Sequence, residues 1–245
     1  MTKQTVVIVL FCTTSLLAGF SPTICALTTE LPKGYEVTAQ LSGLHTPNKP
    51  HSRKSQAPPA VLWLNPADTR VAPPEPQGNY TLLQKNKMFT PHLLVVPVGS
   101  TVMFPNADPF FHNVFSLFDG KRFDLGLYEA GTSKAVVFSR EGVSYIFCNI
   151  HSQMSAVVIA TATPYYAVAD VDGVFRLHNV PSGKYEMHVW IEGKRQPILD
   201  QLAKIVRISG ESTDLGKILI DDQSGTPAHL NKFGQPYDPD TKPDY

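Results

Sequence analysis

Three side chains with metal-binding atoms recur at three-residue spacing in the middle of the chain. They are Cys148, His151 and Met154, and they follow an apolar run that reads as a strand. A fourth candidate, His112, lies upstream after an Asn-, Asp- and Pro-rich stretch. A thiolate, two imidazoles and a thioether are the donor set of a blue-copper centre, with three ligands in a trigonal plane and the thioether at long axial range. The sequence therefore predicts one bound copper ion.

Each of these residues has an ordinary interpretation when it is taken alone. A single histidine is usually structural or solvated, a single methionine usually belongs to a core, and a single cysteine is usually an inert buried thiol. Zinc also accepts cysteine and histidine, but a thioether is a poor zinc ligand. The joint pattern favours copper because all four residues fall where one coordination geometry needs them.

The beginning of the chain reads as an export signal. Lys3 supplies a positive charge, an apolar stretch runs over 6–20, and Ala26 ends a run of small residues. The alternative is an uncleaved membrane anchor, but Thr, Ser and Gly residues dilute the apolar run and a membrane span needs about 20 apolar residues. Cleavage would remove Cys12 and Cys25 and leave Cys148 without a disulfide partner. We therefore expect a periplasmic or secreted protein that has no membrane segment after cleavage.

The composition is that of a folded chain rich in turns. Hydrophobic residues make up 42% and charged residues 17% of the 245 positions, and the formal net charge is +0. This balance argues against a basic nucleic-acid surface, so nucleic acid is not an expected partner. The 21 prolines and 16 glycines favour short strands over long helices.

Short strand-like runs separated by turn residues predict an all-β protein with two domains. The first runs are 35–41, 60–64, 93–97, 101–104, 135–139, 143–148 and 156–161, and those of the second unit are 166–170, 174–177, 185–191, 204–208 and 216–220. Asp172-Gly173 is a hairpin signal within the second unit. We divide the chain into a signal peptide (1–26), an N-terminal strand and linker (27–58), a first domain (59–161), a second small β-domain (162–221) and an extended tail (222–245).

The region from about Gln84 to Thr161 resembles the cupredoxins, the blue-copper family. The resemblance rests on Val96–Val102, His112–Val114 and the Cys148–Met154 loop, which is as short as that of amicyanin, the methylamine-utilisation cupredoxin. It implies a Greek-key β-sandwich with copper at one end, held by His112, Cys148, His151 and Met154. It also implies that Asn113 ties the two ligand-bearing loops together, and that His151 faces solvent as an electron port.

The region from about Pro164 to Ile220 resembles the transthyretin-like or carboxypeptidase-regulatory-like β-domains. The matching stretches are Asp170–Leu177 and Val180–Tyr185. The resemblance implies a second small β-sandwich that serves as a support or an interaction module and carries no catalytic group.

The resulting functional hypothesis is an exported one-electron carrier that is not an enzyme. Its partner would be another redox protein, either a cytochrome or a dehydrogenase, which would dock on an apolar rim formed by Pro109, Phe110 and Phe111. The alternative for these three residues is that they fill the end of the sandwich. The alternative for the whole chain is a copper carrier or assembly module without redox turnover. A copper enzyme is disfavoured because no His-x-His pair for further copper ions is present.

Overall fold

The protein is built from β-strands, as the sequence predicts. The structure is a computed structural model that describes residues 33–43, 57–68, 74–75, 79–117, 120–210, 212–220 and 231–235. The expected signal peptide, most of the linker and most of the tail lie outside these residues. Among the described residues one short helix, α1 (Gln196–Leu202), interrupts the strands. None of the helices in this part of the chain is long and apolar enough to cross a membrane.

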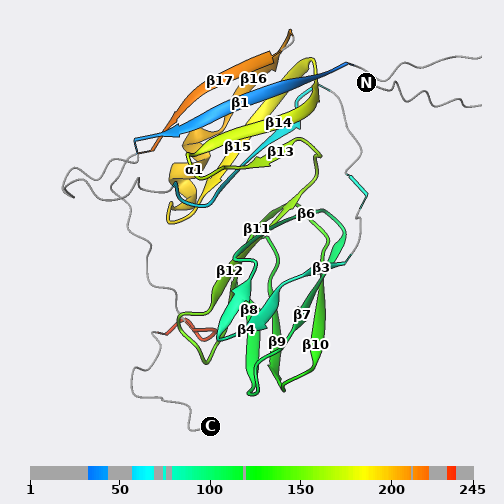
Figure 1. Cartoon of the computed structure of the whole chain (residues 1–245), viewed down its shortest axis with the longest axis vertical. Helices are drawn as coiled ribbons and strands as arrows, with labels where there is room; N and C mark the ends of the chain where they lie inside the picture. Colours follow the sequence, from blue (N-terminus) through cyan, green and yellow to red (C-terminus); the bar gives the residue numbers. More distant parts are fainter. Residues whose placement is uncertain are drawn as a thin grey trace, which may run out of the picture.

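The lower half of the molecule in Figure 1 is a β-sandwich. Its larger sheet has five strands, in the order β6 (Leu93–Pro97), β12 (Ser155–Thr161), β11 (Gly142–Phe147), β8 (His112–Ser116) and β9 (Phe123–Tyr128). A three-stranded sheet consists of β10 (Ser133–Phe138), β7 (Ser100–Pro105) and β3 (Tyr80–Thr81). The hairpin of β4 (Leu83–Lys85) and β5 (Met88–Thr90) completes this unit. Its core holds Phe104, Phe138, Cys148 and Met154 together.

The upper half contains two smaller sheets that share a second core. One sheet has the order β14 (Val174–Pro181), β1 (Gly34–Ser42) and β17 (Ser212–Leu219). The other has the order β13 (Tyr166–Val168), β2 (Ala60–Pro66), β15 (Gly183–Ile191) and β16 (Lys204–Ile208). We call these two sheets with α1 the accessory unit.

The pairing of β2 corrects the predicted boundary at residue 59. The sequence placed Ala60–Leu64 in the first domain, but β2 pairs with β15 from Ala60–Ile191 to Pro66–Tyr185. The N-terminal strand β1 likewise pairs with β14 and β17. An apolar run indicates a strand but not its partner, and these partners lie more than a hundred residues away along the chain.

The Asp172-Gly173 turn forms, but the strands on either side of it do not form a hairpin ladder. Gly173 adopts a φ of 79°, which suits glycine, and its N–H donates to the carbonyl of Asp170. The preceding strand, β13, pairs with β2, whereas the following strand, β14, pairs with β1. The turn signal therefore predicts the chain reversal correctly and the sheet assignment wrongly.

The two halves share core residues through the outer face of the five-stranded sheet. In β12, Ala156, Val158 and Ala160 face the sandwich core, whereas Val157 and Ile159 pack in the core of the accessory unit. Trp190 of β15 is buried and donates its indole N–H to the hydroxyl of Tyr145 in β11, at 3.0 Å. Because both of its faces are covered, β12 is apolar without alternation from Ala156 to Ala160.

This shared core predicts that the two halves unfold together. Replacing Trp190 with Ala should lower the free energy of unfolding by roughly 3–5 kcal/mol, because a large buried side chain and its packing are lost. Urea unfolding followed by fluorescence and circular dichroism measures this, with Val168→Ala at an exposed position of the same unit as the control. Two well-separated transitions, or an effect no larger than that of the control, would contradict a shared core.

Candidate metal centre

The loop from Cys148 to Met154 extends the hairpin of β11 and β12. The two strands pair in register from Gly142–Ala160 to Phe147–Ser155, so Cys148 and Met154 leave them side by side. The N–H of Cys148 donates to the carbonyl of Met154 at 3.2 Å, and the N–H of Met154 donates to the carbonyl of His151 at 3.0 Å. The hairpin register thus places a thiol, an imidazole and a thioether on one short closed loop.

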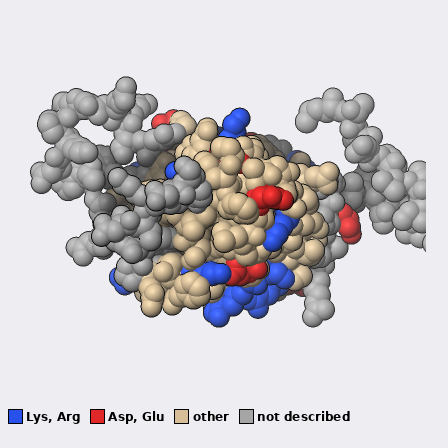
Figure 2. Space-filling view, turned by 90° about the horizontal axis from the view of Figure 1, so that it is seen from below, with Lys and Arg blue, Asp and Glu red and all other residues tan. Residues whose placement is uncertain are grey.

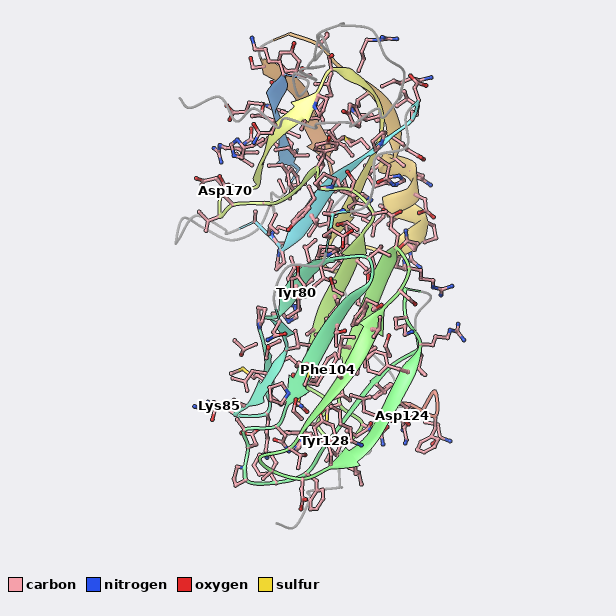
Figure 3. All side chains as sticks on the ribbon, turned by 90° about the vertical axis from the view of Figure 1, so that its right-hand side faces the viewer. Tyr80, Lys85, Phe104, Asp124, Tyr128 and Asp170 are labelled. Atoms are coloured by element: carbon pink, nitrogen blue, oxygen red, sulfur yellow. The ribbon has the colours of Figure 1, made fainter. Side chains whose placement is uncertain are left out.

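His112 reaches the same end of the sandwich from β8. This strand is the neighbour of β11, with Phe115 opposite Phe147, and His112 itself lies opposite Tyr128 of β9. Figure 3 shows Tyr128, Lys85 and Asp124 at the lower end of the sandwich, below Phe104. His112 begins its strand at this end, and the Cys148–Met154 loop projects from β11 at the same end.

The three nitrogen and sulfur donors converge. Cys148 Sγ lies 3.8 Å from His112 Nδ1 and 3.6 Å from His151 Nδ1, and the two Nδ1 atoms are 3.1 Å apart. A first-row ion bonded at about 2.0 Å to nitrogen and about 2.3 Å to sulfur, with trigonal angles, would separate its donors by about 3.5–3.7 Å. The donor atoms are therefore already spaced for one metal ion, and they form the group of residues that fits a copper site.

Burial determines the charge of these groups before metal binds. It raises the pKa of the Cys148 thiol, against the opposing effect of backbone N–H groups of Asn113, Ile150 and His151 that point at the sulfur. Burial, and then the neighbouring His112, lowers the pKa of His151 to about 4. Burial also lowers the pKa of His112. At neutral pH the metal-free site consequently holds a thiol and two neutral imidazoles.

Asp108 orients His112. The Nε2–H of His112 donates to Asp108 Oδ2 at 2.9 Å, which leaves the Nδ1 lone pair directed toward Cys148 and His151. Although burial raises the pKa of Asp108, hydrogen bonds from the N–H of Lys87, from His112 and from the N–H of Asn86 outweigh it, and the net shift is downward. The carboxylate therefore stays ionised and ties His112 to the turn between β4 and β5. Such outer carboxylates fix the tautomer of a ligating histidine and increase its basicity.

Phe110 covers the two imidazoles. The ring centroid of Phe110 lies 5.3 Å from that of His112 and 5.6 Å from that of His151. The Nζ of Lys87 lies 5.3 Å from the ring centroid of Phe110. His151 is only 8% exposed, and its buried Nε2 has no hydrogen-bond partner among the described residues. The expectation that His151 faces solvent is therefore wrong, because its ring is buried and packs against the rings of Phe110 and His112. Of the predicted rim, Pro109 and Phe111 are exposed, and Phe110 is half-buried.

Met154 and Asn113 complete the predicted site residues. Met154 is fully buried and packs in the same cluster as Cys148, so its thioether remains a predicted axial ligand. The side-chain amide of Asn113 donates to Asp124 Oδ1 at 2.7 Å, while its own Oδ1 is buried without a hydrogen-bond partner among the described residues. The link from Asn113 to the Cys148 loop is its backbone N–H, which points at the sulfur.

Three residues around the centre were not predicted to act there. They are Asp108, Asp124 and Lys232. Asp108 stands four residues before His112, and a carboxylate this close to a candidate ligand is a signal that sequence alone offers. Asp124 and Lys232 reach the centre through contacts between distant parts of the chain, and no local pattern marks them.

Comparisons with known proteins find similarity at the level of solved structures. No family model matches the sequence, and no curated protein matches it. A purple cupredoxin from Nitrosopumilus maritimus is 26% identical, with a TM-score of 0.31, over 35% of this chain and 100% of that chain. A copper-containing nitrite reductase from Thermus scotoductus SA-01 is 23% identical, with a TM-score of 0.34, over 40% of this chain and 26% of that chain. A mutant amicyanin with Cu(I) is 18% identical, with a TM-score of 0.33, over 34% of this chain and 83% of that chain.

Removing the carboxylate of Asp108 should weaken metal binding. In Asp108→Asn, His112 loses a charged acceptor and a fixed tautomer, so we expect a roughly 10–100-fold lower affinity. Competition with a chromophoric chelator measures this, and Glu129→Gln, at an exposed carboxylate beyond the end of β9, is the matched control. An unchanged affinity in Asp108→Asn would show that the carboxylate does not orient the ligand.

Metal uptake at pH 7 should release close to one proton. The thiol of Cys148 has a raised pKa and must lose its proton to bind metal, whereas His151, with a pKa of about 4, is already neutral. The affinity should therefore rise about tenfold per pH unit near neutrality. Calorimetry with Zn²⁺ in buffers of different protonation enthalpy counts the protons. Release close to zero, or close to two, would contradict these protonation states.

Proposed function

We propose that the protein is an exported one-electron carrier that uses a single copper ion. The observation that carries this proposal is the convergence of a buried thiol and two buried imidazoles within 4.8 Å of one another, with a buried methionine on the same loop. This set mixes soft sulfur, which suits Cu(I), with imidazole, which suits Cu(II). Bound copper would supply a one-electron couple that protein side chains lack.

The contribution of the chain is to hold the donors in place in both oxidation states. Cys148, His151 and Met154 share a loop closed by hydrogen bonds, and His112 is fixed by Asp108. Backbone N–H groups of Asn113, Ile150 and His151 surround the sulfur and favour its anionic form when metal replaces the proton. Donors that need not move when an electron arrives favour rapid electron transfer.

Burial of the donors favours electron transfer over copper delivery. A protein that hands its copper to an acceptor needs ligands that the acceptor can reach, whereas Phe110 lies over both imidazoles and the sulfur is fully buried. The same cover argues against an enzyme whose substrate binds directly at the metal. Delivery remains the second candidate because the accessory unit offers a further surface for an assembly partner.

The surroundings of the site favour a transient redox partner. The end of the sandwich, seen in Figure 2, is mostly uncharged at its centre, and Lys and Arg side chains gather along one edge. Phe111, which is 48% exposed, and the exposed Pro109 belong to the segment that leads into β8 at His112. A small apolar contact of this kind suits a short-lived complex with a cytochrome or a dehydrogenase. The export signal expected from the sequence supports a periplasmic location for this exchange.

The test is the colour and the paramagnetic signal of the copper-loaded protein. We expect an intense thiolate-to-Cu(II) absorption band that bleaches reversibly on reduction, with the small copper hyperfine splitting of a covalent Cu–S bond. Both should vanish in Cys148→Ser and remain in His178→Gln, a control at an exposed histidine of β14. Colour retained in Cys148→Ser would refute the proposal, and a colourless complex that surrenders its copper to an acceptor would favour delivery.

A further inference from the structure

A short piece of the C-terminal region folds against the metal centre. Residues 231–235 form a turn in which the side chain of Asn231 accepts the N–H groups of Phe233 and Gln235, and the N–H of Asn231 donates to the carbonyl of Gln235. Figure 1 shows this segment, in red, beside the loop that joins β11 to β12. These internal hydrogen bonds fix the conformation of the turn, and the position of Lys232 is fixed with it.

Lys232 contacts the cysteine loop and β9, the strand next to the one that carries His112. Its backbone N–H donates to Asn149 Oδ1 at 3.0 Å, and Asn149 follows Cys148 directly. Its ammonium group lies 2.9 Å from Asp124 Oδ2 in β9. These contacts join residues 83 and 108 positions apart. One residue of the C-terminal segment therefore spans from the cysteine loop to the strand beside His112.

Asp124 links Lys232 to Asn113, whose backbone N–H points at the sulfur of Cys148. Its Oδ1 accepts the side-chain amide of Asn113 and the N–H of Gly126, and Asn113 in turn points its backbone N–H at Cys148. A chain of contacts thus runs from Lys232 through Asp124 and Asn113 to Cys148. The other contact of Lys232 is with Asn149, the residue that follows Cys148.

The Cys148–Met154 loop needs outside support of this kind. It contains no proline, and Ser152 and Gln153 at its tip are exposed. The side chain of Asn113 is hydrogen-bonded to Asp124, and the contacts of His112 with Cys148 and His151 are those of the candidate ligands themselves. Lys232 adds a contact that joins the loop, at Asn149, to β9, the neighbour of β8.

We propose that residues 231–235 are a third loop of the metal centre and that Lys232 is a positioning residue for Cys148. This inference rests on the proposed copper site and deepens it. The ion pair itself is partly exposed, at 27% for Lys232 and 40% for Asp124, so it adds little to global stability. Its effect is local, on the orientation and mobility of the cysteine loop.

The experiment compares full-length Lys232→Met with Lys232→Arg and with the matched control Lys217→Met, at an exposed lysine of β17. In the metal-free protein we expect amide hydrogen exchange in residues 148–154 to become several-fold faster in Lys232→Met alone, at an unchanged unfolding midpoint. In the copper-loaded protein we expect the thiolate band and the copper hyperfine splitting to shift in Lys232→Met and to be largely restored in Lys232→Arg.

Asn149→Ala removes the same bridge from the loop side. Its effect on loop exchange should match that of Lys232→Met, and the double variant should add little, because residues that act through one contact are not additive. Loop exchange and spectra equal to wild type in both single variants would overturn the inference. Absence of the thiolate band in the wild type would instead overturn the copper proposal, while the exchange measurement on the metal-free protein would still test the loop contact.

Discussion

The whole arrangement depends on placing three metal-binding atoms in an apolar interior without leaving a charge there. Burying an unpaired ion is costly, so a preformed site in a sandwich core must keep its donors neutral until the metal arrives. The raised pKa of Cys148 and the lowered pKa values of His112 and His151 achieve this. The charge of Asp108, which touches His112, is compensated by two backbone N–H groups and by His112 itself.

The rest of the fold supplies rigidity to this neutral cluster. The β11–β12 hairpin sets the register of the cysteine loop, and β12 is held on both faces, by the sandwich core on one side and by the accessory unit on the other. The hydrogen bond from the indole N–H of Trp190 to the hydroxyl of Tyr145 joins the accessory unit to β11. The accessory unit thereby acts as a support for the strands that carry three of the four predicted ligands.

The sequence predicts the local features well and the distant contacts poorly. The strands at 93–97, 143–148 and 156–161 follow from local apolar runs, and the pairing of Cys148 with His151 follows from their local spacing. His112 lies 36 positions before Cys148 and was predicted from the donor set and the resemblance to the cupredoxins. The strand β9 was missed, because Phe123–Tyr128 contains a glycine and an aspartate and lacks a continuous apolar run. The partner of β2 and the contacts of Lys232 depend on residues that meet only in the folded chain. The burial of His151 was also missed, because it depends on how the rings of Phe110 and His112 pack against it in the folded chain.

The most direct measurement of the central claim is X-ray absorption at the copper edge of the full-length, copper-loaded protein. Our account requires one sulfur and two imidazole nitrogens in the inner shell, because Cys148, His112 and His151 already face one another at bonding separation for a single ion. Cys148→Ser should remove the sulfur contribution and leave the nitrogens. An inner shell made only of nitrogen and oxygen in the wild-type protein would show that copper binds elsewhere, and the account would fail.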